Sequence, residues 1–593
     1  IVYSLALAVY CSSWTFYGAV GTAARDGLAY LPIYLGPILL FVFGFGLLRR
    51  LLQVVRQRNI TSIADFIGAR FGKSHGLAAL VAVIAVIAVV PYIALQFKAV
   101  AMSFGVLGGA GYGAASAGGV DSALWCALLL AMFAILFGTR SIDATEHHHG
   151  LMLAIALESL IKLLAFVALA GYALWRGPGL LATVQLPATQ LTHGLSPGFL
   201  AQTMLAFCAM FCLPRQFQIG MVECEDTGDL TRARWMVPLY LVIVSVAVLP
   251  IVAAGAHMPL VRDGAADAWV LTLPMAYGDR GMALLAFIGG FSAATGMVIV
   301  ASVALSTMIS NDLVMPALLR IPRLRLEQRS DLSKLVLRVR RVAIIALAAM
   351  AYGYYRVAAN AENLAATGLL AFAAVAQFAP ALLAALYWSG ASRRGVMVGL
   401  VGGFVVWSYT LLLPAVIRSA SWLQNGPFGW DWLRPQALFH LGGWDPVMHG
   451  TFWSLLVNVG CLVFVSLRLR PSLEERLHAA MFIDTDPAGR SGAGDWRGRV
   501  AVADLRTLAE RIVGERTSAR AFDDYALRRG RPLLAGESAD RALIQYTERL
   551  LASAVGAANA RRILISALSG SGLDLAEAMA LMDEASQELR FNR

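Results

Sequence analysis

Apolar runs of about 20 residues recur along this chain, and they restrict its fold more than any other feature. An α-helix of that length crosses the hydrocarbon core of a bilayer. Only 14% of the 593 residues are charged and 58% are hydrophobic, whereas a soluble chain of this size carries far more charge. We therefore predict an all-α polytopic membrane protein with about twelve spans. The spans are expected at residues 1–22, 30–53, 76–106, 122–138, 150–175, 198–222, 232–256, 280–310, 335–357, 362–389, 394–418 and 450–468.

The basic residues predict how these spans are oriented. Lys and Arg gather in every second connection, as in Arg49 to Lys73 and Arg320 to Arg341. Basic loops face the cytoplasm, so residue 1 and the C-terminus are both expected on the cytoplasmic side. The net charge of +11 then reflects membrane topology, and no nucleic-acid partner is expected.

The first apolar run has a centre that is unusual for a membrane helix. Residues Tyr10 to Gly18 place hydroxyls, aromatic rings and a glycine at bilayer depth. Unwound backbone at that depth is tolerated only where it faces protein or a water-filled cavity, and many transporters hold substrate at such a broken helix. Two interpretations remain open: a broken, ligand-binding span, or a Ser/Thr-rich face that packs against another helix.

Two connections between spans predict structure of their own. Residues 60–73 offer Thr61 or Ser62 as an N-cap, and an apolar stripe follows, which predicts a short surface helix. Residues 418–449 are rich in Trp and Phe, as suits the outer membrane interface. We expect them to form a packed external cap without a ligand role.

The chain changes character after residue 470. Residues 471–500 are expected to form a linker, because Asp, Gly, Arg and Ser dominate from 482 onward. Residues 501–593 have helical periodicity in about four segments and predict a small soluble bundle, with Ser571 to Asp574 as a cap of the last helix. This region has no nucleophile constellation, phosphate loop or metal-ligand spacing.

Three segments resemble the sodium/solute symporter family, which is built on the five-plus-five inverted repeat of the LeuT-type fold. They are Ala8 to Gly21 followed by Gly27 and Pro32, then Ile60 to Phe71, and then Phe378 to Trp388. The resemblance implies a transporter domain over residues 1–470, in which spans one to five and six to ten are the two repeats. Spans eleven and twelve would be additions, and one N-terminal helix common in the family is expected to be missing.

A narrower resemblance concerns signalling. The segments Asp143 to His148, Leu213 to Phe217 and Phe291 to Val314 are similar to the transporter-like sensor of CbrA-type histidine kinases, and residues 501–593 resemble the STAC domain that follows it. This implies a bacterial inner (plasma) membrane protein whose partners are downstream kinase domains of the same chain and a response regulator. A homodimer through the soluble bundle is expected. No phospho-acceptor box or ATP-binding glycine motif occurs, so these residues are not expected to catalyse phosphotransfer.

Two ionisable residues in the fifth span carry the prediction about coupling. Glu158 and Lys162 are four residues apart and therefore share one helix face. Ionisable groups at bilayer depth are usually functional, so they form either a structural ion pair or a coupling-ion relay.

The resemblance implies where a sodium ion would bind in coupled relatives: the backbone of Ala8 and Cys11, the acidic group at Glu158, and hydroxyls on the eighth core helix. The aligned hydroxyl positions are Gly296 and Met297 here, so oxygen ligands are few for a hard cation. Lys162 can supply a positive charge instead. We therefore predict proton coupling, or none, in preference to sodium coupling. The candidate coupling residues are Ala8, Cys11, Glu158, Lys162, Ser292 and Thr295.

The candidate substrate-binding residues come mainly from the first span. Lys98 either snorkels to the interface or faces a substrate carboxylate, and the two glutamines are expected to bond neighbouring helices. Span six is expected to form the opposite wall, with a break at Pro214. The candidates are Ser12, Ser13, Trp14, Thr15, Tyr17, Gln96, Lys98, Gln202 and Phe207.

No metal site is expected, because the consecutive side chains Glu146 to His149 point in different directions on a helix. The six cysteines show no paired spacing. The predicted function is a transporter-type sensor that binds and transports a small carboxylate nutrient, with L-histidine as the leading candidate and proton coupling. The alternatives are a binding-only receptor and a sensor or symporter for acetate or another short carboxylate.

Overall fold

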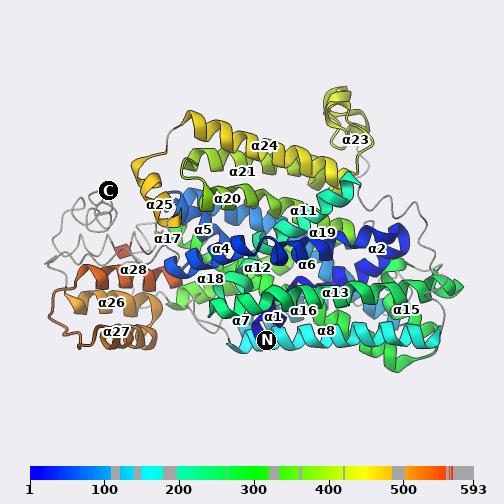
Figure 1. Ribbon diagram of the computed structural model, residues 1–593, viewed down its shortest axis with the longest axis horizontal. Helices are drawn as coiled ribbons and strands as arrows, with labels where there is room; N and C mark the ends of the chain where they lie inside the picture. The colour runs from blue at the N-terminus through cyan, green and yellow to red at the C-terminus, as the bar shows by residue number, and fades with distance from the viewer. Residues whose placement is uncertain are drawn as a thin grey trace.

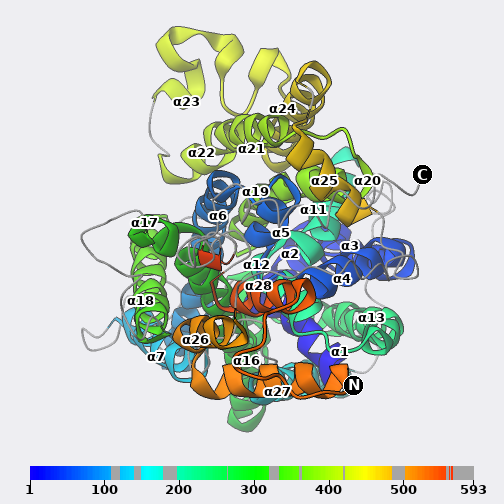
Figure 2. The same cartoon turned by 90° about the vertical axis from the view of Figure 1, so that its left-hand side faces the viewer.

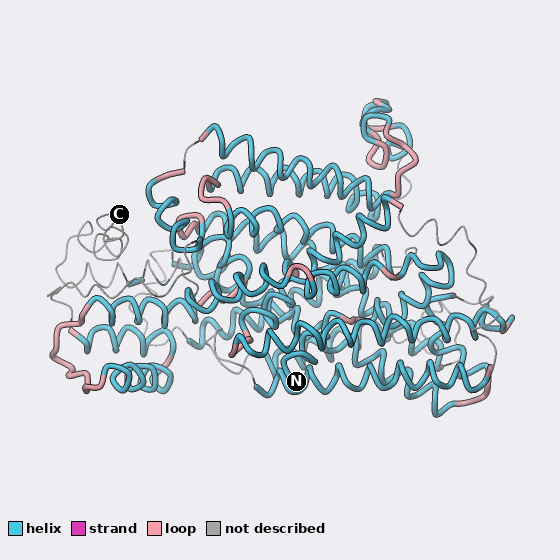
Figure 3. Tube along the Cα trace, viewed as in Figure 1, coloured by secondary structure: helices cyan, strands magenta, loops and turns pink. Residues whose placement is uncertain are grey.

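The computed structural model confirms the all-α prediction. It describes residues 1–108, 121–138, 149–177, 196–262, 265–319, 333–358, 364–417, 421–469, 471–483, 501–555, 560 and 563–564. These residues are almost entirely helical (Figure 3), and the extended pairing among them is a single bridge between Ala501 and Ser538.

Each predicted span has a helical counterpart. Within the described residues, seven helices are long and apolar enough to cross a membrane, or up to nine if each of two bent pairs is one span. The helices at the predicted spans include α3 (Pro32–Val42), α6 (His75–Leu107), α7 (Ser122–Gly138), α8 (His149–Arg176), α11 (Pro197–Cys212), α13 (Thr227–His257), α16 (Arg280–Met308), α18 (Ser333–Ala358), α19 (Leu364–Val375), α20 (Ala379–Tyr387), α21 (Arg393–Trp407) and α24 (Pro446–Arg468). The chain is therefore a multi-pass membrane protein.

Most of these helices run along the long axis of the molecule (Figure 1). Helices α21 and α24 pack against each other as an outer layer, and α8 lies on the opposite side, against α16 and α13. The C-terminal helices α26 (Val502–Val513), α27 (Glu515–Arg529) and α28 (Arg541–Val555) gather at one end. Figure 2 looks onto that end.

The predicted helix after residue 60 exists, but its surface position was wrong. Helix α5 (Ile63–Arg70) begins at Ser62, whose hydroxyl accepts a hydrogen bond from the Asp65 N–H at 3.0 Å. All eight residues of α5 are buried. The cover comes from α25 (Leu473–Ile483), where Phe482 packs edge-on against Phe66 with ring centroids 5.4 Å apart.

Helix α25 occupies the first part of the predicted linker at 471–500, and it packs on α5 and α20. Residues 484–500 lie outside the described residues. So does most of the chain after Val555, including the predicted cap at Ser571 to Asp574. Two of the four predicted bundle helices are described, as α26 and α28, and the helix between them, α27, was not predicted.

The bundle is in contact with the membrane domain. Glu548 on α28 forms an ion pair with Lys73, which lies between α5 and α6. Helix α28 also packs against η7 (Ile309–Val314), the turn that continues α16. The C-terminal helices therefore contact the ends of two membrane elements.

The aromatic residues of the predicted external cap pack on one another. The rings of Trp430 and Trp432 stack with centroids 5.9 Å apart, and Phe439 lies 5.0 Å from Trp453 of α24. In Figure 1 this segment, around α23 (Ser421–Asn425), projects from the end of the molecule opposite the bundle.

Candidate functional site

The first span is broken at the predicted place. Helix α1 (Val2–Leu7) tightens into the turn η1 (Ala8–Tyr10), the chain becomes extended at Cys11 with ψ 96°, and it resumes as the wide turn η2 (Trp14–Gly18) followed by α2 (Ala19–Asp26). Local side chains favour the break, because a hydroxyl that bonds nearby backbone competes with helical hydrogen bonds. Thr15 Oγ1 donates to the Ser12 carbonyl at 2.8 Å.

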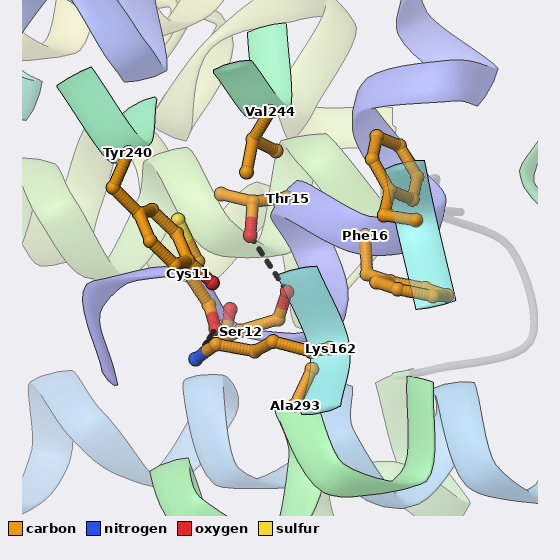
Figure 4. A pocket seen from close by; sticks show the side chains of 9 residues that line it. Cys11, Ser12, Thr15, Phe16, Lys162, Tyr240, Val244 and Ala293 are labelled. Atoms are coloured by element: carbon orange, nitrogen blue, oxygen red, sulfur yellow. Dashed lines mark hydrogen bonds between the residues drawn. The ribbon is translucent and has the colours of Figure 1, made fainter. Parts of the chain in front are cut away.

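Lys162 binds directly to this break. Its Nζ donates to the carbonyl of Ala8 at 2.8 Å and to the carbonyl of Cys11 at 2.7 Å, and the side chain is buried (Figure 4). Carbonyls at the C-terminal end of a helical segment carry partial negative charge, even where a turn N–H donates to one of them, as the Cys11 N–H does to Ala8. The ammonium therefore neutralises the end of α1–η1 from the side of α8.

Glu158 shares the helix face of Lys162, but the two side chains do not form an ion pair. Glu158 Oε1 accepts from Thr295 Oγ1 at 3.0 Å, and the Glu158 carbonyl accepts from Ser292 Oγ at 2.9 Å. Its Oε2 has no hydrogen-bond partner. This oxygen lies only 2.2 Å from the position that a β-carbon on residue 296 would take, so it fits because residue 296 is a glycine. Of the two interpretations, the structural ion pair is therefore not formed: Lys162 binds the first span, whereas Glu158 binds α16.

The sixth span is broken as well, as predicted from Pro214. Helix α11 ends at Cys212, Leu213 is extended with ψ 128°, and α12 (Pro214–Phe217) and η5 (Gln218–Val222) continue at an angle of 51°. The side chains of Arg215 and Gln216 are buried at this second break.

Tyr92 of α6 connects the two breaks. Its hydroxyl forms a hydrogen bond with Ser12 Oγ at 2.9 Å and accepts one from Arg215 Nη2 at 3.2 Å. Gln96, one turn further along α6, accepts from the Ser13 N–H at 3.1 Å and donates to the Tyr92 carbonyl at 3.2 Å. Gln96 thus bonds a neighbouring helix, as expected.

The aromatic candidates of the first span pack against other helices. Trp14 lies edge-on to Phe372 of α19, with centroids 5.0 Å apart. Tyr17 OH accepts from Ser103 Oγ of α6 at 3.1 Å. Both rings are buried, so they join η2 to its neighbours in this arrangement.

Three other candidates lie outside the wall of the cavity beside the break. Lys98 and Gln202 are partly exposed on α6 and α11, and Phe207 directs its ring toward Gly44 after α3. The cavity has a volume of about 10 Å³, the space of about one water. It is lined by Cys11, Ser12, Thr15, Phe16, Lys162, Phe166, Tyr240, Val244 and Ala293 (Figure 4). The broken spans are therefore packed together, with space for about one water between them.

No cluster of three or more His, Cys, Asp or Glu side chains that could hold a metal ion occurs within the described part of the chain. Residues Glu146 to His148 lie outside it, and His149 pairs with Glu225 at 3.2 Å.

Sequence reasoning missed Tyr92, Arg215 and Gln216 as site residues. Arg215 could have been found by the rule that selected Lys162, namely an ionisable residue at bilayer depth. In the sequence it stands next to Pro214, inside the segment Leu213 to Phe217 that carries the resemblance to the sensor of CbrA-type kinases.

No protein-family model matches the sequence, and no curated protein matches it either. Among solved structures, the chain is similar to a substrate-bound, outward-open Na⁺-coupled sialic acid symporter, with 13% identity and a TM-score of 0.53, over 80% of this chain and 91% of that chain. This observation decides the architecture. The chain has a LeuT-type fold.

Two further structures match over a similar length with lower scores. MhsT in complex with L-phenylalanine has 14% identity and a TM-score of 0.39, over 79% of this chain and 97% of that one. A manganese transporter of Eremococcus coleocola has 13% identity and a TM-score of 0.41, over 79% and 94%. At these identities the likeness concerns the fold alone.

Proposed function

We propose that this chain is a transporter-type membrane sensor. Its membrane domain would bind and carry a small nutrient by alternating access, in which ligand binding shifts the population of conformations. Its soluble bundle would pass the state of that domain to a histidine kinase and a response regulator. The symporter fold and the meeting of two broken spans support the transport part of this proposal.

The observation that carries the proposal is the position of Lys162. Its ammonium sits on the Ala8 and Cys11 carbonyls, where the family resemblance places a sodium ion. A lysine can release and regain its proton, whereas a second cation at this place would be repelled by the ammonium. We therefore propose that a proton, rather than sodium, is the coupling ion. The symporter with the similar fold is Na⁺-coupled, so sodium is the alternative to test.

The proposed substrate is a small carboxylate, with an amino acid such as L-histidine as the first candidate. The similarly folded symporter carries sialic acid, which is itself a carboxylic acid. The first break offers the hydroxyl of Ser13, which has no partner, beside that of Ser12. Acetate or another short carboxylate is the alternative within the same class.

The sensor part rests on the docking of the soluble bundle. Glu548 pairs with Lys73, and α28 packs on η7 at the end of α16. Glu158 binds the same helix, α16, through Thr295. A shift of α16 during transport would therefore change the contacts between η7 and α28 directly.

A binding-only receptor is the second candidate, and the small cavity of about 10 Å³ favours it. Uptake by the purified chain in liposomes distinguishes the two. With labelled L-histidine we expect saturable uptake driven by an inward proton gradient. Binding without uptake would support the binding-only receptor. Uptake driven by a sodium gradient alone would overturn proton coupling.

Two variants make this uptake experiment specific. Lys162→Met should abolish or uncouple uptake, because the titrating charge at the break is lost. Lys334→Met removes an exposed lysine at the start of α18 and should leave uptake unchanged. Wild-type pH dependence in Lys162→Met would reject the role of Lys162.

A further inference from the structure

Arg215 is a buried cation without an anion. Its side chain is 1% exposed, and no carboxylate in the described part of the chain pairs with it. Nη2 donates to Tyr92 OH at 3.2 Å, and the guanidinium carbon lies 4.6 Å from the centroid of the Tyr92 ring. Nε and Nη1 have no hydrogen-bond partner.

Such an arrangement is unfavourable for a residue that only supports the fold. A guanidinium keeps its proton in proteins, so Arg215 cannot escape burial by becoming neutral. A buried charge requires a partner and filled hydrogen bonds, and arginines inside membrane domains mark substrate or ion pathways. An anion would both neutralise the guanidinium and fill its free hydrogen bonds.

One further polar side chain beside each break is also unsatisfied. The side-chain Oε1 and Nε2 of Gln216 and the Oγ of Ser13 are buried without partners. Tyr92 holds Arg215 next to Ser12 through its hydroxyl. Unpartnered donors therefore occur on both broken spans, at the place where α6 brings these spans together.

We infer that Arg215 is the residue that binds the substrate carboxylate, with the Gln216 amide and the Ser13 hydroxyl as neighbouring polar contacts. A guanidinium holds a carboxylate through paired, charge-assisted hydrogen bonds. A ligand bound there would neutralise the charge of Arg215 on the sixth span and bridge this span to the first. Substrate binding would therefore favour a closed site. This inference rests on the proposed function and specifies its substrate class as an anion.

Thermal stabilisation of the purified full chain in lipid nanodiscs tests the inference, because a ligand that binds the folded state raises Tm. The probes are two matched pairs, L-histidine with histamine and acetate with acetamide, in which the second member lacks the carboxylate. We expect an acid to raise Tm of the wild type and its partner to have no effect. Arg215→Gln should remove this discrimination, and Arg338→Gln, at an exposed arginine of α18, should keep it.

A second variant and the ligand-free Tm separate binding from folding. Arg215→Lys keeps the charge but loses the paired N–H donors that bind both oxygens of a carboxylate. We therefore expect Kd for the acid to rise roughly 10- to 100-fold, which corresponds to the loss of one charge-assisted hydrogen bond. Without ligand, Arg215→Gln should be at least as stable as the wild type, because it removes an uncompensated charge. A clearly lower ligand-free Tm in Arg215→Gln would make Arg215 a structural residue and overturn the inference.

The failure of this inference differs from failure of the proposed function. If the wild type takes up a solute but Arg215→Gln still prefers acids, or if acid and neutral partner bind alike, the inference is wrong and transport stands. If neither probe pair shifts Tm of the wild type, the assignment to small carboxylates is wrong. Uptake by the same preparation then shows separately whether transport survives.

Discussion

Replacing Lys162 with methionine should make the broken segment around Cys11 separate from its neighbours more often, without unfolding the protein. We call this separated state the open break. Methionine has a similar length and suits an apolar site, so packing is retained and only the two hydrogen bonds are lost. The Ala8 carbonyl keeps a second donor, the Cys11 N–H at 3.0 Å. The Cys11 carbonyl, however, is left buried with no donor.

The size of the effect follows from that one carbonyl. A buried acceptor that loses its partner costs about 1–3 kcal/mol, and every 1.4 kcal/mol or so is tenfold in an equilibrium constant. The fraction of molecules with an open break should therefore rise roughly 10- to 100-fold. The Cys11 thiol reports on this opening, because it is buried at the break and lines the small cavity.

The assay is the rate of N-ethylmaleimide labelling in a protein that keeps Cys11 as its single cysteine. A matched protein that keeps only Cys126, buried in α7, reports global unfolding. We expect faster labelling of Cys11 alone. An unchanged rate at Cys11, or an equal rise at Cys126, would refute the reasoning.

Two other predictions concern packing and docking. A β-carbon at Gly368 would stand 2.2 Å from Trp14 Cε3. Gly368→Ala should therefore overpack η2 and destabilise the protein by about 1–3 kcal/mol, measured as a lower Tm. The control is Gly171→Ala, where no atom lies within 4 Å, and it should not lower Tm. Lys73→Glu should reduce hydrogen-exchange protection of α28 by repelling Glu548, and adding Glu548→Lys should restore this protection. Equal protection in the wild type, the single variant and the double variant would show that this ion pair does not hold the bundle.

The sequence predicted the features that local chemistry decides. The break in the first span followed from hydroxyls and a glycine at bilayer depth, and the break in the sixth from Pro214. The cap at Ser62 followed from its spacing to Asp65. Each depends on residues a few positions apart, so neighbouring residues were enough.

Features decided by distant segments were missed. The spacing of Glu158 and Lys162 allowed an ion pair between them. Instead, Lys162 bonds the Ala8 carbonyl, 154 residues earlier, and Glu158 bonds Thr295. Helix α5 was expected at the surface because nothing nearby in sequence covers it, whereas α25 does so from about 400 positions later. Which face of a helix is covered, and by what, is set by the assembled fold.

The central claim is that an ammonium, rather than a metal cation, occupies the break of the first span. The most direct test is Tm of the purified chain as a function of Na⁺ concentration, with choline replacing sodium at constant ionic strength. An ammonium on the Ala8 and Cys11 carbonyls predicts no sodium-specific change in Tm. A saturable rise in Tm with Na⁺ would contradict the account.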